Sequence, residues 1–485
     1  MKKIFLFLFI LFLPQAIFAL KNRSSQSFMF TRPCHQNIPA YQAFWHNIIY
    51  DNPAEKPNSV QTLLFYQKSS EIAETHKGEQ LSEYFLLRNR SVLTVQGDAI
   101  GNPNRDVRAE WLGLPSTFNG TFTVFPQQKQ AGIFIDVKHD LKEQFNTELL
   151  ENAWLGASIS AMTVDNNLHI HQTTMPTSTN NCSIAAALSE PRIHFNQFLP
   201  KTRSSGFTDF RLTLGSQFMF RDDMQLNILS YLLIPLASQQ SGRILFEAIR
   251  GFNGHIGLGF NADFQIPLTD SDSTYLIAFY LDAEDLFLLK KNEIRSIDLR
   301  NKEWSRFLLL NKRDGTQVNV PAINVLLTQK VQVKPYNIAD ISTGFRFKQG
   351  WLDIEVGYAL WIHGNETLRL KKPFSKDWGI AAAPGEVTPE GLPATASMST
   401  IAQQAAPDKD ANGNNTFIAI EANDLFLRSG ASRSSYTNRI HLAVGASDRG
   451  MCTNGMFGFG GFYEFPQNNG ALQQFGFWAK LGVAF

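Results

Sequence analysis

Histidine and serine side chains that lie close together in the chain are the first candidates for chemistry. A histidine can act as a general base toward a serine hydroxyl when the two groups share a hydrogen bond. His363 lies two positions before Asn365, and His441 lies near Ser434 and Ser435. Such triads are defined in space rather than by spacing, and the chain has ten histidines and many serines. The spacing therefore selects no catalytic residue, and we expect no enzyme.

Metal ligands are the second possibility. His169 and His171 would share one face of a strand, which suffices for a weak chelate, but no further ligand accompanies them. The three cysteines, Cys34, Cys182 and Cys452, lack the paired spacing of a metal site. Either one disulfide and one thiol, or three unpaired cysteines, is compatible with the sequence. We expect no metal and no cofactor.

Charge and hydropathy exclude other classes of protein. The 485 residues include 44 Lys and Arg and 43 Asp and Glu, without a basic block that could follow a phosphate backbone, so we expect no nucleic acid partner. After the first residues, no run of 18 apolar residues occurs, which excludes a helical membrane protein. The chain is also too rich in aromatic residues and too poor in charge for disorder.

The first residues indicate export. Lys2 and Lys3 precede the apolar run Ile4 to Leu13, and the small residue Ala19 follows the breaker Pro14. This order is that of a secretory signal peptide, and the apolar run is too short to cross a bilayer. We expect residues 1–19 to be a cleaved signal peptide.

The segments that carry the polar side chains have the sequence pattern of β-strands. In Trp351 to His363, Asn253 to Ile266 and Asp209 to Phe220, apolar and polar residues alternate, which is the period of a strand. Several such segments are about 10 to 13 residues long, whereas tilted membrane strands need about 9 to 11. A β-sandwich predicts the same alternation. However, the polar faces are rich in Gly, Ser, Thr and Asn, which suits a lumen better than a solvated surface.

The alternation assigns a set of charged and polar side chains to that lumen. They carry both signs of charge, and such groups tune which solutes pass a pore. They could equally pair with one another and make the interior rigid. The pore-lining candidates are Asp209, Arg211, His255, Asp263, Arg346, Asp353, Glu355, Arg439, His441, Glu464 and Lys480.

The last strand carries the most specific motif. Phe485, Val483, Leu481 and Phe477 share one face, and the chain ends on phenylalanine. This ending resembles the terminal strand of Gram-negative outer-membrane β-barrels, and the resemblance implies that these four residues are read by the barrel-assembly machinery. In its alternating strands and its last strand, the chain resembles porins and barrels similar to the fatty acid transporters. The resemblance implies a Gram-negative outer-membrane location, and no subfamily is selected.

Together these patterns predict an all-β fold, a transmembrane antiparallel up-and-down barrel with an even strand number of about 14, in the range 12–18. We expect residues 20–58 to be a periplasmic or plug-like segment and residues 59–485 to form the barrel, with long loops near 288–330 and 364–414. The turns at Arg221 to Asp223 and at Gln349 and Gly350 should face the periplasm. Four later strands, expected near 415–423, 439–447, 456–465 and 473–485, would end the chain on the outer side, so one strand is either missed or overcounted, within 364–414 or 424–438.

The predicted function is passive diffusion of small hydrophilic solutes through an outer-membrane pore. Two alternatives remain: a plugged barrel that transports hydrophobic compounds, and a structural or adhesive surface barrel whose loops bind partners. The expected partners are outer-membrane lipid, the assembly machinery and small solutes. A homo-oligomer is compatible with the sequence.

Overall fold

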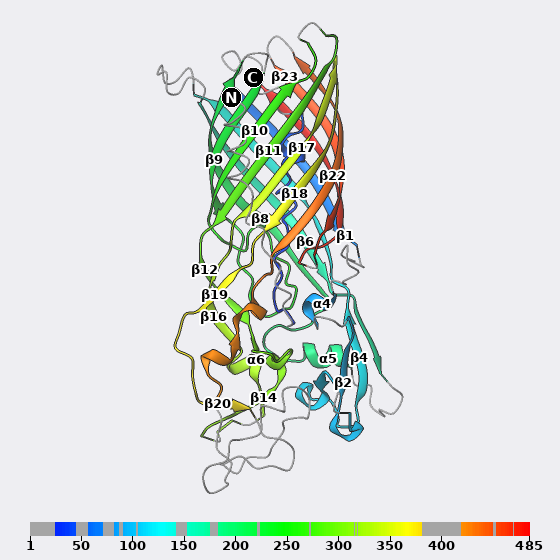
Figure 1. The fold of residues 1–485 in the computed structure, drawn as a ribbon, viewed down its shortest axis with the longest axis vertical. Helices are drawn as coiled ribbons and strands as arrows, with labels where there is room; N and C mark the ends of the chain where they lie inside the picture. The colour runs from blue at the N-terminus through cyan, green and yellow to red at the C-terminus, as the bar shows by residue number, and fades with distance from the viewer. Residues whose placement is uncertain are drawn as a thin grey trace.

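The computed structural model describes residues 25–44, 57–70, 82–86, 91–102, 105–141, 153–174, 183–220, 224–270, 273–314, 316–317, 319–380, 419–449, 453–468 and 470–485. Within them, twelve antiparallel strands form a closed barrel (Figure 1). In chain order these are β1 (Asn58–Ser69), β5 (Gln127–Asp140), β6 (Ala153–Asn167), β8 (Lys201–Met219), β9 (Gln225–Pro235), β10 (Gly257–Pro267), β11 (Leu276–Leu288), β17 (Ile338–Gln349), β18 (Leu352–His363), β22 (Ser435–Arg449), β23 (Asn454–Pro466) and β24 (Gln474–Ala484). The barrel closes because β1 pairs with β24 on one side and with β5 on the other.

The even strand number is confirmed, and the expected value of about 14 is wrong. In the barrel, β18 pairs directly with β22, so no strand from 415–423 stands between them. In the described part of that stretch, from residue 419 onward, Ala419 forms an isolated bridge to Gly379 and a 3-10 helix begins at Ala422. Three strands follow β18 rather than four, which restores the parity. Several strands outside the barrel pair with one another in small separate sheets. A local sequence pattern cannot tell whether a strand belongs to the barrel or to such a sheet.

The two ends of the barrel differ. Phe485 lies at the end where Gln349 and Gly350 turn between β17 and β18, as expected, and Gly350 adopts a positive φ of 57° there. Residues 221–223 lie outside the described residues, but the strands that flank them, β8 and β9, meet at the same end. The long connections all emerge at the opposite end, where they form a second body of structure (Figure 1).

This second body, the loop domain, consists of small sheets and short helices. The sheets are β2 (Leu93–Gln96) with β3 (Val107–Arg108), β4 (Asn119–Val124) and β7 (Ile170–Thr174); β12 (Lys291–Ser296) with β16 (Thr328–Lys334) and β19 (Thr367–Leu370); β13 (Asp298–Leu299) with β21 (Leu425–Phe426); and β14 (Leu309–Lys312) with β15 (Val320–Pro321) and β20 (Trp378–Ile380). The helices are α4 (Ser82–Phe85), α5 (Ile184–Ser189) and α6 (Ala322–Val325). One large apolar core, with Trp111 and Trp304 at its centre, holds these pieces together.

The barrel wall is polar or small inside and apolar outside. Asp353, Glu355 and Trp361 of β18 are buried, while Val356 and Tyr358 between them are exposed. The alternation follows from the strand geometry, which points successive side chains to opposite faces. The outer face is consequently an apolar band around the barrel.

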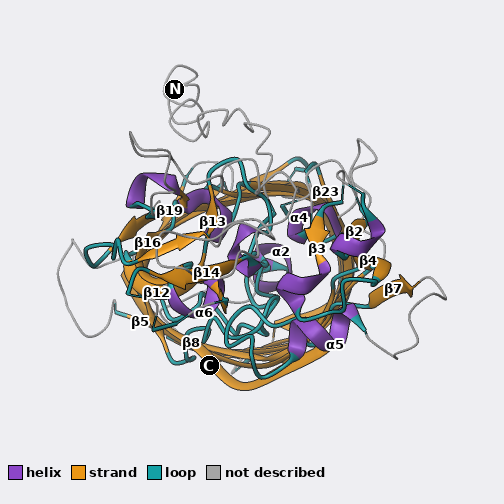
Figure 2. Cartoon of the chain, turned by 90° about the horizontal axis from the view of Figure 1, so that it is seen from below, coloured by secondary structure: helices purple, strands orange, loops and turns teal. Residues whose placement is uncertain are grey.

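The inside of the barrel is occupied by a segment of residues 25–44, which are here called the N-terminal plug. They include the short helix α2 (Ile38–Gln42), which has Pro39 in its first turn. Most plug residues are buried, because they are enclosed by the wall. Viewed along the barrel axis, α2 lies within the ring of strands (Figure 2).

Candidate functional site

Arg32 is the central anchor of the plug. Its Nη1 donates to Glu464 Oε2 on β23 at 2.7 Å, and its Nη2 pairs with Asp340 on β17. Its own carbonyl oxygen accepts from Gln130 Nε2 at 3.1 Å and from Gln67 Nε2 at 3.4 Å. One residue of the plug therefore ties four strands of the wall together.

Arg439 and Lys480 of the wall hold the following residues of the plug. Arg439 Nη1 donates to Asn37 Oδ1 at 2.7 Å, while its Nη2 pairs with Glu464 at 2.7 Å. Lys480 Nζ donates to the carbonyl oxygens of Ala40 and Tyr41 at 3.1 and 2.9 Å. Both belong to the single turn of α2, whose free carbonyls carry partial negative charge. Buried charges of β22 and β24 thus help to fix the plug.

The other end of the plug packs against glycines. An added Cβ at Gly445 or Gly458 would stand 2.8 or 2.4 Å from the ring of Phe44. These two positions face each other on β22 and β23. Their missing side chains leave the space that the phenyl ring fills, near the end of the barrel with short turns.

An aromatic cluster surrounds the plug at the loop-domain end. Phe28 and Phe30 of the plug are buried with Phe252 and the wall residue Trp361, and Phe30 stacks on the ring of His363 at 4.9 Å. Four aliphatic side chains of the inner wall complete the cluster: Leu233, Leu286, Leu288 and Ile338. At this level the inner wall is apolar, unlike the water-filled interior of a porin.

Beyond this cluster the plug enters the loop domain. Ser25 Oγ donates to Asp298 Oδ2 at 2.8 Å, and the amides of Gln26 and Ser27 donate to the carbonyls of Tyr84 and Ser429. The plug therefore runs from the loop domain through the lumen toward the end that bears the short turns.

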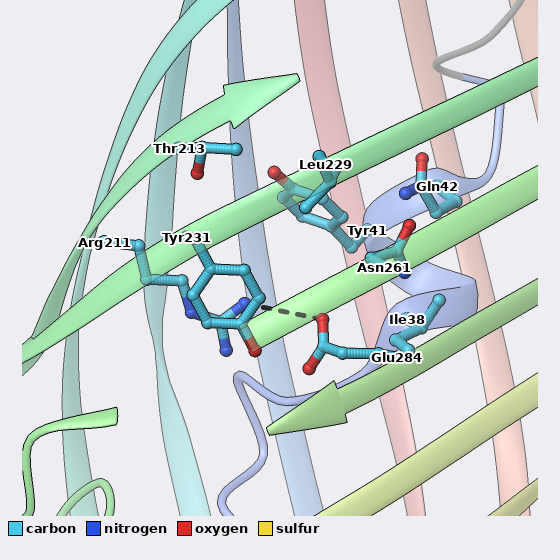
Figure 3. Close-up of a pocket in the computed structure, with 9 residues that line it drawn as sticks. All are labelled: Ile38, Tyr41, Gln42, Arg211, Thr213, Leu229, Tyr231, Asn261 and Glu284. Atoms are coloured by element: carbon cyan, nitrogen blue, oxygen red, sulfur yellow. Dashed lines mark ion pairs between the residues drawn. The ribbon is translucent and has the colours of Figure 1, made fainter. Parts of the chain in front are cut away.

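A cavity lies between α2 and the wall strands β8 to β11 (Figure 3). Its empty volume is about 330 Å³, part of which is open to solvent. Arg211 lies over the ring of Tyr231 at 4.8 Å and 3.9 Å from Glu284. Arg211 Nη2, Asn261 Oδ1 and Glu284 Oε1 make no hydrogen bond to another protein group. Such polar atoms suit bound water, so this side of α2 is held less directly than the side at Lys480.

The structure places every predicted pore-lining residue on the inner side of the wall or at its mouth. His255 lies at the loop-domain rim, 2.7 Å from Glu293. Arg346 pairs with Glu355 at 2.8 Å across β17 and β18, and His441 shares a hydrogen bond of 2.7 Å with the Tyr280 hydroxyl. Asp209 lies 3.2 Å from His35 of the plug, and Asp353 lies 3.9 Å from Lys348. Asp263 accepts a hydrogen bond from Asn227. The contacts of the other four, Arg211, Arg439, Glu464 and Lys480, are described above. Whether any of them governs the passage of a solute stays a prediction.

Sequence reasoning missed the plug side of these contacts. Arg32, His35 and Asn37 lie in a segment without periodicity, and their wall partners Asp340, Asp209 and Arg439 are far away in the chain. A lone arginine between aromatic residues and Pro33 is a weak signal that nothing else in the sequence strengthens.

The four residues of the terminal motif lie on the outer face. Phe477, Leu481 and Phe485 are about half exposed, and Val483 is partly buried. Their role as an assembly signal stays a prediction.

The described part of the chain offers neither a metal site nor a serine–histidine pair. No group of three or more His, Cys, Asp or Glu residues there could hold a metal ion. No helix there is long and apolar enough to span a membrane. Within the same residues, neither His363 nor His441 makes a hydrogen bond to a serine; the first stacks on Phe30 and the second contacts Tyr280.

Comparison with known proteins gives matches among solved structures only. No family model matches the chain, and no curated protein matches its sequence. An outer membrane channel from Pseudomonas putida F1 is 8% identical with a TM-score of 0.38, over 90% of this chain and 99% of that one. A FadL homologue from Pseudomonas aeruginosa is 9% identical with a TM-score of 0.30, over 96% and 98%. The toluene transporter of Ralstonia pickettii is 7% identical with a TM-score of 0.27, over 95% and 96%.

Proposed function

We propose that this chain is a closed outer-membrane β-barrel that lets small, largely apolar molecules pass when the N-terminal plug moves. The observation that carries the proposal is the occupied lumen: the N-terminal plug passes through it and is held by buried charges on several strands.

The outer face supports the membrane location. In a closed barrel every strand edge is paired, so no backbone N–H or C=O group of an edge is left without a hydrogen bond in the bilayer. Large apolar side chains are exposed all around this barrel, and water would not favour so continuous a band. They include Leu64, Leu214, Phe260, Phe345, Ile440, Phe459 and Phe477. Short turns face the periplasm in such barrels, so the loop domain would face outward.

The inner wall at the loop-domain end supports an apolar cargo. With the plug displaced, Leu233, Leu286, Leu288, Ile338 and Trp361 would line the entrance. Water-filled porins have polar interiors instead. An apolar molecule that entered here would replace the contacts that Phe28 and Phe30 make in the closed state. This reading favours the hydrophobic transporter over the open pore for hydrophilic solutes.

The first test is the conductance of the full-length mature protein in a planar bilayer. The wild-type protein should be closed, whereas Arg32→Gln should give discrete conductance steps. The variant leaves Asp340 without its cation, and breaking a buried pair costs about 3–5 kcal/mol. Arg203→Gln is the matched control, because Arg203 and its partner Asp165 are exposed and do not contact the plug.

Two results would contradict the proposal. Steady large conductance of the wild-type protein would mean that the plug does not close the lumen. Silence of both variants, with the barrel shown to be folded by its heat-modifiable migration, would mean that release of the Arg32 anchor does not open it.

A further inference from the structure

One sheet of the loop domain continues the barrel wall. β12 follows β11 after Leu289 and Lys290, β16 precedes β17, and β19 follows β18. The pairing order β12, β16, β19 repeats the order β11, β17, β18. Figure 1 shows these three strands directly beside the mouth of the barrel. The outer face of this sheet therefore extends the outer face of the barrel.

Three cations stand on that outer face. Lys330 and Lys334 are exposed, while Val331 and Val333 between them are buried in the loop-domain core. Arg369 of β19 is exposed and lies opposite Gln332. Lys330 and Lys334 are thus its two diagonal neighbours, at about 7–8 Å for such pairs. We call these three residues, Lys330, Lys334 and Arg369, the basic patch.

The basic patch lacks a partner among the described residues. None of its three side chains makes an ion pair or a hydrogen bond with these residues. The outward neighbours Asn292, Gln332 and Thr367 are uncharged. The acids of this sheet region, Glu293 and Glu366, lie on the buried side with Arg295. Like charges placed together on a sheet repel, so the arrangement favours an external anion.

More cations border the patch, and apolar residues separate it from the barrel. Lys290, Lys371 and Lys372 are exposed at the ends of the neighbouring strands. Leu289 and Tyr336, on the connections toward the barrel, are 49% and 45% exposed. An outward carboxylate at this rim, Asp285, accepts a hydrogen bond from Asn337. From the barrel toward the loop domain, the outer surface therefore changes from the apolar band to the rim and then to the cations.

We propose that the basic patch binds the phosphate groups of anionic glycolipids in the outer leaflet of the membrane. The inference rests on the membrane location proposed above, which puts the patch at the level of the lipid headgroups. Arg369 can bind a phosphate in a bidentate manner, while the lysines supply point charges. The patch faces sideways, next to the apolar band, as a lipid-binding surface requires.

The test uses the full-length protein in phosphatidylcholine nanodiscs, with lipid A carrying two phosphates as the probe. Lipid A should raise the midpoint of thermal unfolding, because a ligand of the folded state stabilises it. In Lys330→Gln/Lys334→Gln/Arg369→Gln the apparent affinity should fall by about tenfold or more, since three charges that attract an anionic surface are removed. Lys330→Arg/Lys334→Arg should bind like the wild-type protein.

A matched control removes three cations elsewhere in the loop domain. Lys312→Gln/Arg313→Gln/Lys376→Gln changes the charge equally, on or beside β14 and β20, which lie far from the barrel (Figure 1). It should keep the lipid A effect. Equal effects in the two triple variants, or none of lipid A on the wild-type protein, would overturn the proposal. Equal stabilisation by inorganic phosphate would overturn the lipid as the source. A protein that does not enter a bilayer would instead refute the proposed membrane location.

Discussion

The guanidinium of Arg295 lies over the ring of Phe28, with its central carbon 3.2 Å from the ring centroid. Arg295 belongs to β12 of the loop domain, whereas Phe28 belongs to the N-terminal plug. The same guanidinium donates to Glu293 Oε2 at 2.8 Å and to the Gly430 carbonyl at 2.9 Å. Arg295 is therefore one of the groups by which the loop domain holds the plug, beside the contacts of Ser25, Gln26 and Ser27, and a change in this cation should affect how firmly the plug is held.

Replacing Arg295 by lysine should loosen the plug. Lysine keeps the charge but cannot reproduce the planar fork that contacts Glu293, Gly430 and the ring. A loss of about 1–2 kcal/mol would speed opening roughly 5- to 30-fold. Cys34 reports this opening, because its side chain is buried in the closed state and should react slowly there.

The measurement is the rate of maleimide labelling of Cys34, with Cys182 and Cys452 replaced by serine. Arg300→Lys is the control, since Arg300 is exposed and donates to the Asn423 carbonyl in the same domain. Equal labelling rates in the Arg295 variant and its parent would show that Arg295 does not restrain the plug.

Acid should weaken the cluster around Glu293. Burial alone would raise the pKa of this carboxyl, but Arg295 and the hydrogen bond from His255 hold it below its ordinary value of 4.5. A lowered pKa contributes stability that is present above pH 4.5 and is lost as the pH falls through the lowered value. The stability difference between the wild-type protein and Glu293→Gln should therefore shrink as the pH falls below about 4.5. Urea unfolding followed by tryptophan fluorescence measures it, and a difference that is constant down to pH 3 would contradict the assignment.

Gly458 should not accept a methyl group while Phe44 is in place. Gly458→Ala puts a carbon 2.4 Å from the ring, and overpacking of this kind typically costs about 1–3 kcal/mol. Gly455→Ala on the same strand is the control, because nothing lies within 4 Å of its added carbon. Cys34 labelling should speed up in the first variant only. The additional change Phe44→Ala should remove the difference between the two alanine variants; its persistence would place the clash elsewhere.

A polar group in the apolar entrance should change the cargo. Leu286 is fully buried in the aromatic cluster, so Leu286→Asn introduces an amide where we expect an apolar molecule to pass. Uptake of a radiolabelled small aromatic hydrocarbon by intact cells should fall about tenfold relative to uptake of glucose, since burying an unpaired amide costs about 1–3 kcal/mol. Leu64→Asn on the outer face is the control. An unchanged ratio would remove Leu286 from the path.

The faces of the wall could be predicted from sequence, because the period of a strand is local. Asp353 and Lys480 were assigned to the interior by alternation alone, and the structure buries both. The contacts of the plug could not be predicted, since Arg32 and Asp340 are 308 positions apart and neither shows its partner in its neighbourhood. The expected strand number is wrong for a related reason: the pattern near 415–423 does not show where the segment pairs, and its residue Ala419 bridges Gly379 while β18 pairs directly with β22.

The path of the plug has a consequence for how the barrel is built. β1 pairs with β24, so the ring is completed by joining the first barrel strand to the last. The plug precedes β1 in the chain and is bound by residues of β17, β22, β23 and β24. If the plug takes its place before β1 pairs with β24, those strands fold against a segment that carries the partners of their buried charged groups. The plug, which we propose closes the lumen, would then also guide the assembly of the barrel around it.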